Sequence, residues 1–253
     1  MKNLFFLGLL LFPSLLFAQK RKPFIARTSS EAGVSLTSNG SLSALAFTGT
    51  QYWGIGKNKK NFKFGLGGRL TSSFGSGKLE YITAPAILTS GKTGPSVFFA
   101  EQITQNIDTL SLNATQVNAL NIYLALRYDF AKKWGVEFNI DLVGFSFGGS
   151  KDAKLTYGDG NQLIQNSKAK PTSFNALLIS DNDLGSLNSA FMLSYTIKPK
   201  LKVLAGAAFL FNEYTLDSPV TYTNSIGTTV NAERYRTKQL MFGFGINYLF
   251  KHQ

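Results

Sequence analysis

Apolar and polar side chains alternate with a period of two through most of this chain, and this pattern constrains the fold more than any other feature. In FKFGLGGRLTSSF (62–74), one face receives Phe62, Phe64, Leu66, Leu70 and Phe74. The same alternation recurs in the segments 120–130, 136–143, 187–197, 201–211 and 240–250. Successive side chains of a β-strand point to opposite faces, whereas those of a helix repeat about every 3.6 residues. The chain is therefore predicted to be all-β.

Eight strands are predicted, at about 30–37, 42–55, 62–75, 119–130, 135–148, 187–197, 201–214 and 234–250. Short connections (GKNKKN, AKKW and KPK) alternate with long ones, at 76–118, 149–186 and 215–233. Loops longer than about 15 residues are uncommon in compact domains unless they are functional. This rhythm predicts one antiparallel up-and-down barrel of eight strands, with both ends of its chain on the same side.

Alternation alone does not tell whether the apolar face points into a soluble barrel or out toward lipid. Several strands keep the pattern for about 11–14 residues, and a tilted membrane strand needs about 9–11. Short turns at one end and long loops at the other are typical of outer-membrane barrels. Aromatic residues, which are common in any β protein, also gather beside the short turns and predict an interfacial girdle. The predicted girdle is Tyr52, Trp53, Phe62, Phe64, Tyr128, Phe130, Trp134 and Tyr195. We therefore expect a transmembrane barrel with periplasmic turns and extracellular loops.

The first residues, MKNLFFLGLLLFPSLLFAQ, have the pattern of a secretory signal peptide. The apolar run has about 14 residues, too short for a membrane-spanning helix, which needs about 20. Cleavage is expected between Ala18 and Gln19. The predicted segments are a signal peptide (1–18), an N-terminal periplasmic segment (19–29), the barrel (30–250) and a tail (251–253). A formal charge of +12 would suit nucleic acid, but export argues against that partner.

The chain ends on QLMFGFGINYLFKHQ, in which Gly245, Tyr248 and Phe250 form a Gly-x-x-aromatic-x-aromatic pattern. This pattern resembles the C-terminal assembly signal of bacterial outer-membrane barrels, although the residues KHQ follow it here. The strand layout is similar to that of the small OmpA- and OmpX-like barrels and of Bacteroidota outer-membrane barrel families. The resemblance implies a monomer in the cell outer membrane. It also implies contact with outer-membrane lipids, including lipopolysaccharide, and with the barrel-assembly machinery.

The predicted inner face is polar, and its charged members are Lys63, Arg69, Arg127, Asp129, Glu137, Asp141 and Lys202. Arg127 and Glu137 lie near one turn and could pair, and Arg69 and Asp141 could meet near mid-depth. Buried charges must be paired or hydrated, and an eight-stranded barrel is just wide enough for side chains. The favoured interpretation is a neutral polar plug; the alternative is a proton or ion path.

Catalysis is not expected, because a base must lie within hydrogen-bond reach of its nucleophile and the chain has a single histidine, His252, in the predicted tail. There is no cysteine, and no cofactor or metal is expected. Lysines fill the short turns, at positions 57, 59, 60, 132, 133, 198 and 200. They are either solvated turn residues or a rim that attracts anionic headgroups. The leading function is a structural or surface-binding barrel, followed by a narrow channel or carrier, and then by an enzyme.

Overall fold

The computed structural model describes residues 25–56, 61–92, 96, 99–158, 164–178, 183–223, 227 and 229–252. The predicted signal peptide and most of the segment 19–29 lie outside these residues, as do the lysines at 57, 59 and 60. No helix within the described ranges is long and apolar enough to cross a membrane.

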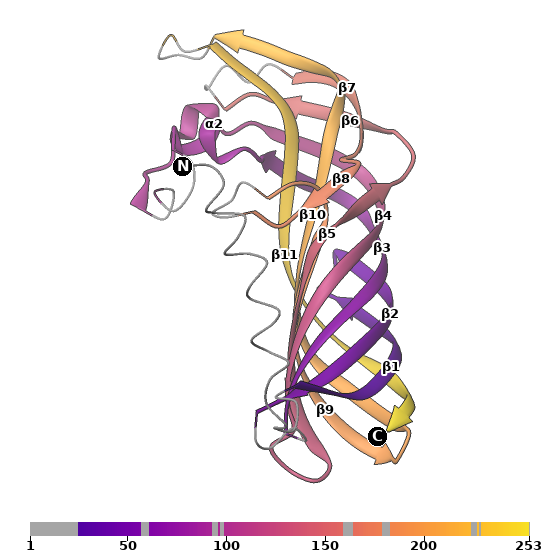
Figure 1. The fold of residues 1–253 in the computed structure, drawn as a ribbon. Helices are drawn as coiled ribbons and strands as arrows, with labels where there is room; N and C mark the ends of the chain where they lie inside the picture. Colours follow the sequence, from indigo (N-terminus) through magenta and orange to yellow (C-terminus); the bar gives the residue numbers. More distant parts are fainter. Residues whose placement is uncertain are drawn as a thin grey trace, which may run out of the picture.

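Eight strands pair in sequence to form a closed antiparallel ring (Figure 1). The first four are β1 (Ile25–Ser38), β2 (Leu42–Ile55), β3 (Phe62–Thr83) and β4 (Thr109–Tyr128). The others are β5 (Trp134–Phe147), β9 (Leu187–Lys198), β10 (Leu201–Thr223) and β11 (Thr229–His252). β5 pairs with β9 across the intervening strands, and β11 returns to β1. The predicted all-β class and the ring of eight are therefore confirmed.

The two ends of the ring differ. At one end, here called the turn end, short turns join β2 to β3, β4 to β5 and β9 to β10, and both ends of the described chain lie there. The opposite end, the loop end, carries the longer connections together with the tight turn between β1 and β2. The predicted alternation of short and long connections matches this arrangement. The long connections, however, contain strands and helices that were not predicted.

The long connections contain more regular structure than predicted. β6 (Lys151–Thr156), β7 (Ile164–Pro171) and β8 (Phe174–Ala176) lie within 149–186, so the prediction of a loop there is wrong. Among the described residues between β3 and β4 are the short helices α2 (Ala86–Ser90) and η2 (Thr104–Asn106). Four strands also extend beyond their predicted ends at the loop end: β3, β4, β10 and β11. The missed segments turn their apolar residues inward and mostly polar residues outward, the reverse of the alternation that identified the other strands.

The extended strands close a second, narrower ring at the loop end. The β1–β2 hairpin stops at its turn, and above it β11 pairs directly with β3. On the other side the β6–β7 hairpin bridges β4 and β10. A ring of β3, β4, β6, β7, β10 and β11 therefore continues the ring of eight (Figure 1).

The polarity of the strands reverses between the two rings, and β3 shows the change clearly. In its first half Leu66 and Leu70 face outward and are exposed, while Lys63 and Arg69 are buried. After a register shift between Ser76 and Leu79, the side chains of Leu79 and Tyr81 are buried. The ring of eight is thus apolar outside and polar inside, and the ring of six has an apolar interior.

The seam between β1 and β11 closes the ring and brings their backbones very close. Ser38 lies opposite Phe242, and the pairing continues down to Ser29 opposite His252. β11 therefore includes Lys251 and His252, two of the three residues expected as a tail. A Cβ atom added at Gly243 would lie 2.0 Å from the Leu36 carbonyl oxygen. Only glycine fits this seam position without displacing backbone.

Candidate functional site

The most organised part of the interior is a chain of alternating charges near the turn end. Lys63 Nζ lies 2.7 Å from Asp129 Oδ2, and Arg127 Nε lies 2.8 Å from Asp129 Oδ1. Arg127 also reaches Glu31 at 3.3 Å, and Lys202 Nζ lies 2.5 Å from the same carboxylate. The cations and Glu31 are buried. Five side chains from four strands and one turn therefore form one connected set.

Asp129 is one residue past β4 and is the most accessible member of this chain, with 23% of its side chain exposed. Burial alone would raise the pKa of the Asp129 carboxyl. The charges of Arg127 and Lys63 outweigh that effect and hold the pKa below its usual range. Asp129 therefore stays charged at neutral pH and holds its two cations in place.

A second polar layer lies toward the middle of the ring. Arg69 Nη1 is 3.1 Å from Asp141 Oδ1, and its guanidinium lies 4.5 Å from the centre of the Tyr123 ring. Arg69 also donates a hydrogen bond to Asn139. The Tyr52 hydroxyl donates to Glu137 at 2.6 Å. The polar groups of this layer are satisfied mainly by one another, as buried polar groups require.

The structure places all seven predicted lumen residues together, and it brings Arg69 and Asp141 into an ion pair. Arg127 and Glu137 are opposite one another in the β4–β5 register, but the ion pairs of Arg127 go to Glu31 and Asp129 instead. Within this interior four basic residues face four acidic ones: Lys63, Arg69, Arg127 and Lys202 against Glu31, Asp129, Glu137 and Asp141.

Glu31 is the acid that sequence reasoning missed. It completes the balance of charges, and it binds partners on three other strands: Arg127, Lys202 and Asn247. The signal was present in SSEAGVSLTS, where Ala32, Val34 and Leu36 alternate with smaller or polar residues. That pattern places Glu31 on the polar face.

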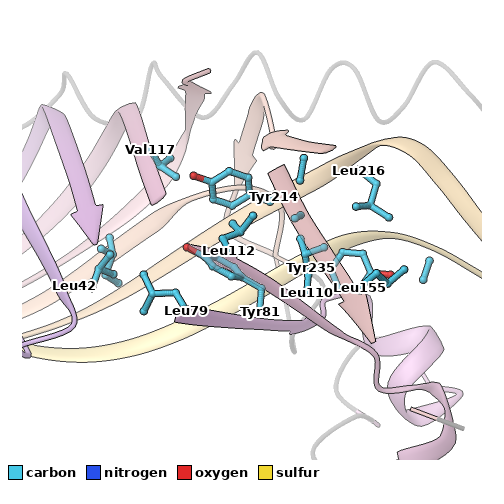
Figure 2. Close-up of a cluster of buried hydrophobic side chains, with 14 of the residues drawn as sticks. Leu42, Leu79, Tyr81, Leu110, Leu112, Val117, Leu155, Tyr214, Leu216 and Tyr235 are labelled. Atoms are coloured by element: carbon cyan, nitrogen blue, oxygen red, sulfur yellow. The ribbon is translucent and has the colours of Figure 1, made fainter. Parts of the chain in front are cut away.

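An apolar plug fills the interior of the narrower ring and the adjoining end of the ring of eight (Figure 2). Tyr81 and Tyr214 meet edge to face, with their ring centres 5.3 Å apart. The plug consists of Leu42, Ala44, Leu79, Tyr81, Leu110, Leu112, Val117, Ala153, Leu155, Ala169, Leu210, Tyr214, Leu216, Ala232, Tyr235 and Met241. Leu88 of α2 packs against it. The interior thus changes along its axis from a charged zone to an apolar one.

Two cavities of very different size lie within the charged zone. The larger, about 680 Å³, opens at the turn end among Lys63, Arg127, Lys132, Lys133 and Lys202. The smaller, about 50 Å³, lies beside Arg69, Tyr123 and Glu137. That volume holds a few water molecules at most. The interior therefore narrows sharply between the open turn end and the plug.

A second buried ion cluster lies near the loop end and was not predicted. Glu213 on β10 is fully buried and binds Arg236 at 2.7 Å and Arg234 at 3.2 Å. Arg236 also donates to the backbone carbonyl of Asp183, and Gly185 N–H donates to Glu213. The cluster therefore fastens the connection between β8 and β9 to the β10–β11 hairpin. Its residues carried no recognisable motif, because the pairing depends on a loop conformation.

The predicted aromatic girdle lies mostly on the outer face near the turn end. Trp134 packs against Tyr195 with the rings tilted and their centres 4.7 Å apart, and the ring centres of Trp53 and Phe64 are 6.1 Å apart. Phe62, Tyr128 and Phe130 are exposed. Tyr52 was wrongly included, because it is fully buried inside the ring. Neighbours along a strand point to opposite faces, so Tyr52 and Trp53 cannot both lie outside.

The remaining sequence predictions concern the end of the chain. Tyr248 and Phe250 are exposed on the outer face of β11, and Gly245 faces Ser35 across the seam. Their role as an assembly signal stays a prediction. The His252 backbone pairs with Ser29. Among the residues that the structure describes, no group of three His, Cys, Asp or Glu side chains could hold a metal ion.

No family model and no curated protein matches this sequence. Among solved structures, the chain is similar to Neisserial surface protein A (10% identity, 88% of this chain and 97% of that chain, TM-score 0.31). It is also similar to the outer membrane protein Ail of Yersinia pestis (8%, 88% and 99%, TM-score 0.33). A third is a major outer membrane protein from Thermus thermophilus (12%, 88% and 100%, TM-score 0.35). Identities and TM-scores this low leave function to be inferred from the geometry of the chain itself.

Proposed function

We propose that this chain is a non-enzymatic outer-membrane β-barrel, in which the ring of eight spans lipid and the ring of six stands outside the cell. One observation carries the proposal: large apolar side chains face outward all around the ring of eight, while ionised residues are buried inside it. In water this arrangement would expose a continuous apolar belt, and in lipid it buries that belt. Ring closure satisfies every strand edge, as a membrane span requires.

The interior favours a sealed barrel over a channel. Four basic and four acidic side chains neutralise one another in the charged zone, and the apolar plug fills the ring above them. An ion entering from the turn end would have to leave water and pass the plug, whose members carry no charge and offer only tyrosine hydroxyls as polar side-chain groups. The working parts of the molecule are then its external surfaces, in a structural or surface-binding role.

The expected partners follow from this placement. Lipid surrounds the apolar belt, and lipopolysaccharide contacts the boundary where the strands turn polar. Exposed lysines on the outer face of the β6–β7 hairpin, at positions 154, 168 and 170, suit its anionic groups. The protein acts as a monomer, and the barrel-assembly machinery inserts it after export.

The absence of cysteine allows the orientation to be tested with single introduced thiols. Lys154→Cys on the outer face of β6 should react with a membrane-impermeant maleimide on intact cells. Lys133→Cys in the β4–β5 turn should react only after the outer membrane is permeabilised. Both positions are exposed, so burial does not bias the comparison. Equal reaction of both in intact cells, or recovery of the mature protein without detergent, would overturn the proposal.

A further inference from the structure

We infer that the cavity at the turn end binds a phosphate-class anion. The cavity is about 680 Å³ and opens at the end of the ring. Its charged lining consists of Lys63, Arg127, Lys132, Lys133, Lys202 and Asp129. Five cations and one acid therefore face a concave space. The inference rests on this geometry and does not depend on the barrel lying in a membrane.

The depth of the acids explains why the cavity is basic although the interior as a whole is neutral. Lys63, Asp129, Arg127, Glu31 and Lys202 form a chain in which the charges alternate and both ends are cations. Glu31 has 1% of its side chain exposed and lies behind the cations, outside the cavity lining. This row of ion pairs thus turns its cations toward the opening, and the cations cover Glu31 behind them.

Lysines at the rim add charge that nothing in the described structure neutralises. Lys132 and Lys133 line the cavity from the β4–β5 turn, and Lys198 and Lys200 flank Pro199, which lines it from the β9–β10 turn. Within the described residues, none of these four lysines makes an ion pair, whereas the deeper Lys63 and Lys202 both do. The rim is therefore available to a ligand, and the floor is preorganised.

Two features of the lining favour a phosphate over a simple halide. Arg127 and several ammonium groups converge on one space, which suits a compact oxyanion with several acceptor oxygens. The residues Phe130, Trp134, Pro199 and Leu249 also line the cavity and add an apolar wall beside the cations. Such a wall fits the organic part of a phosphate ester. That ester is either a phospholipid headgroup or a soluble phosphorylated compound.

The test uses the full mature protein in an uncharged detergent, with Trp53→Phe introduced so that Trp134 is the only tryptophan. The probes are inorganic pyrophosphate, dihexanoyl phosphatidylglycerol and, as a zwitterionic control, dihexanoyl phosphatidylcholine. We expect saturable changes in Trp134 fluorescence with pyrophosphate, with phosphatidylglycerol, or with both. Added salt should weaken them. Binding of pyrophosphate alone would identify a soluble ligand, and binding of phosphatidylglycerol alone a headgroup.

Matched variants separate a local site from general attraction. Lys132→Gln combined with Lys133→Gln should weaken binding about fivefold or more. An exposed ion pair between one lysine and the bound anion contributes up to roughly fivefold in affinity, and two such pairs are lost. Lys78→Gln combined with Lys92→Gln makes the same charge change at exposed positions of the opposite end and should leave affinity unaltered. The inference fails if no probe gives a saturable change at about 10 mM. Equal weakening by both double variants would also overturn it.

Discussion

At the scale of single residues, Glu31 joins three parts of the ring to β1. Its carboxylate accepts hydrogen bonds from Arg127 on β4, Lys202 on β10 and Asn247 on β11. The Glu31 side chain is 1% exposed, so water replaces these bonds only in part. Removing the charge would leave Lys202 buried without an acidic partner and Arg127 with Asp129 alone.

We therefore expect Glu31→Gln to destabilise the protein strongly. Breaking a fully buried ion pair costs about 3–5 kcal/mol, and hydration from the open turn end should reduce this somewhat. The control is Glu80→Gln, which removes an exposed pair with Lys78 and should cost no more than about 1 kcal/mol. Thermal unfolding in detergent, followed by the shift in gel mobility, measures both. Equal losses would contradict the role given to Glu31.

Backbone contact at the seam gives a second expectation. Gly243→Ala would place a methyl group against the Leu36 carbonyl oxygen, and overpacking of this kind costs roughly 1–3 kcal/mol. Gly68→Ala on β3 is the matched control, because nothing lies within 4 Å of the added Cβ atom. The unfolding temperature should fall for the first variant and stay close to wild type for the second. A similar fall in both would point to a general effect of replacing glycine in a strand.

The inward residues of the ring of eight could be read from the alternation because a strand offers only two faces. Arg69 and Asp141 could even be paired, since both lie near mid-depth on the polar face. Glu31 was missed because the first strand, predicted at 30–37, has a weak alternation from which its two faces were not assigned. The partners of Glu213 could not be predicted, because they depend on how the connection between β8 and β9 folds back.

At the scale of elements, the strands that extend past the ring of eight determine the shape of the molecule. β3 has 22 residues and β11 has 24, whereas β1 and β2 have 14 each. The predicted strand ends fell where the outward apolar residues stop. That limit corresponds to the reversal of polarity between the two rings and not to the end of the strand, so the predicted strands were too short and β6 and β7 were missed.

The reversal of polarity within β3 can be tested on one face of one strand. Leu70 and Ile82 both point outward, with exposed fractions of 40% and 47%. A basic residue on the lipid face near mid-membrane costs about 2–4 kcal/mol, and far less in water. Leu70→Arg should therefore lower stability and insertion in lipid vesicles, while Ile82→Arg should be tolerated. Equal tolerance of both variants would show that the ring of eight does not lie in lipid.

At the scale of the whole molecule, the order of the two interior zones predicts electrical behaviour. Purified wild-type protein in planar bilayers should show no steady conductance, because the apolar plug blocks the path beyond the charged zone. Arg127→Ala should lower the unfolding temperature and leave the bilayer current unchanged. Steady, ion-selective conductance of the wild type would instead favour the channel. In that case Arg127→Ala should alter selectivity with a smaller loss of stability.

The seam between the first and last strands also has a kinetic consequence. Asn247 and Glu31 meet across it although 216 positions separate them in the chain. Contacts this distant in sequence form late, because the entropy of closing the loop must be overcome first. Until β11 arrives, β1 presents an unpaired edge that any other extended chain can join. Pairing of β11 with β1 thus ends the period in which this edge can promote aggregation.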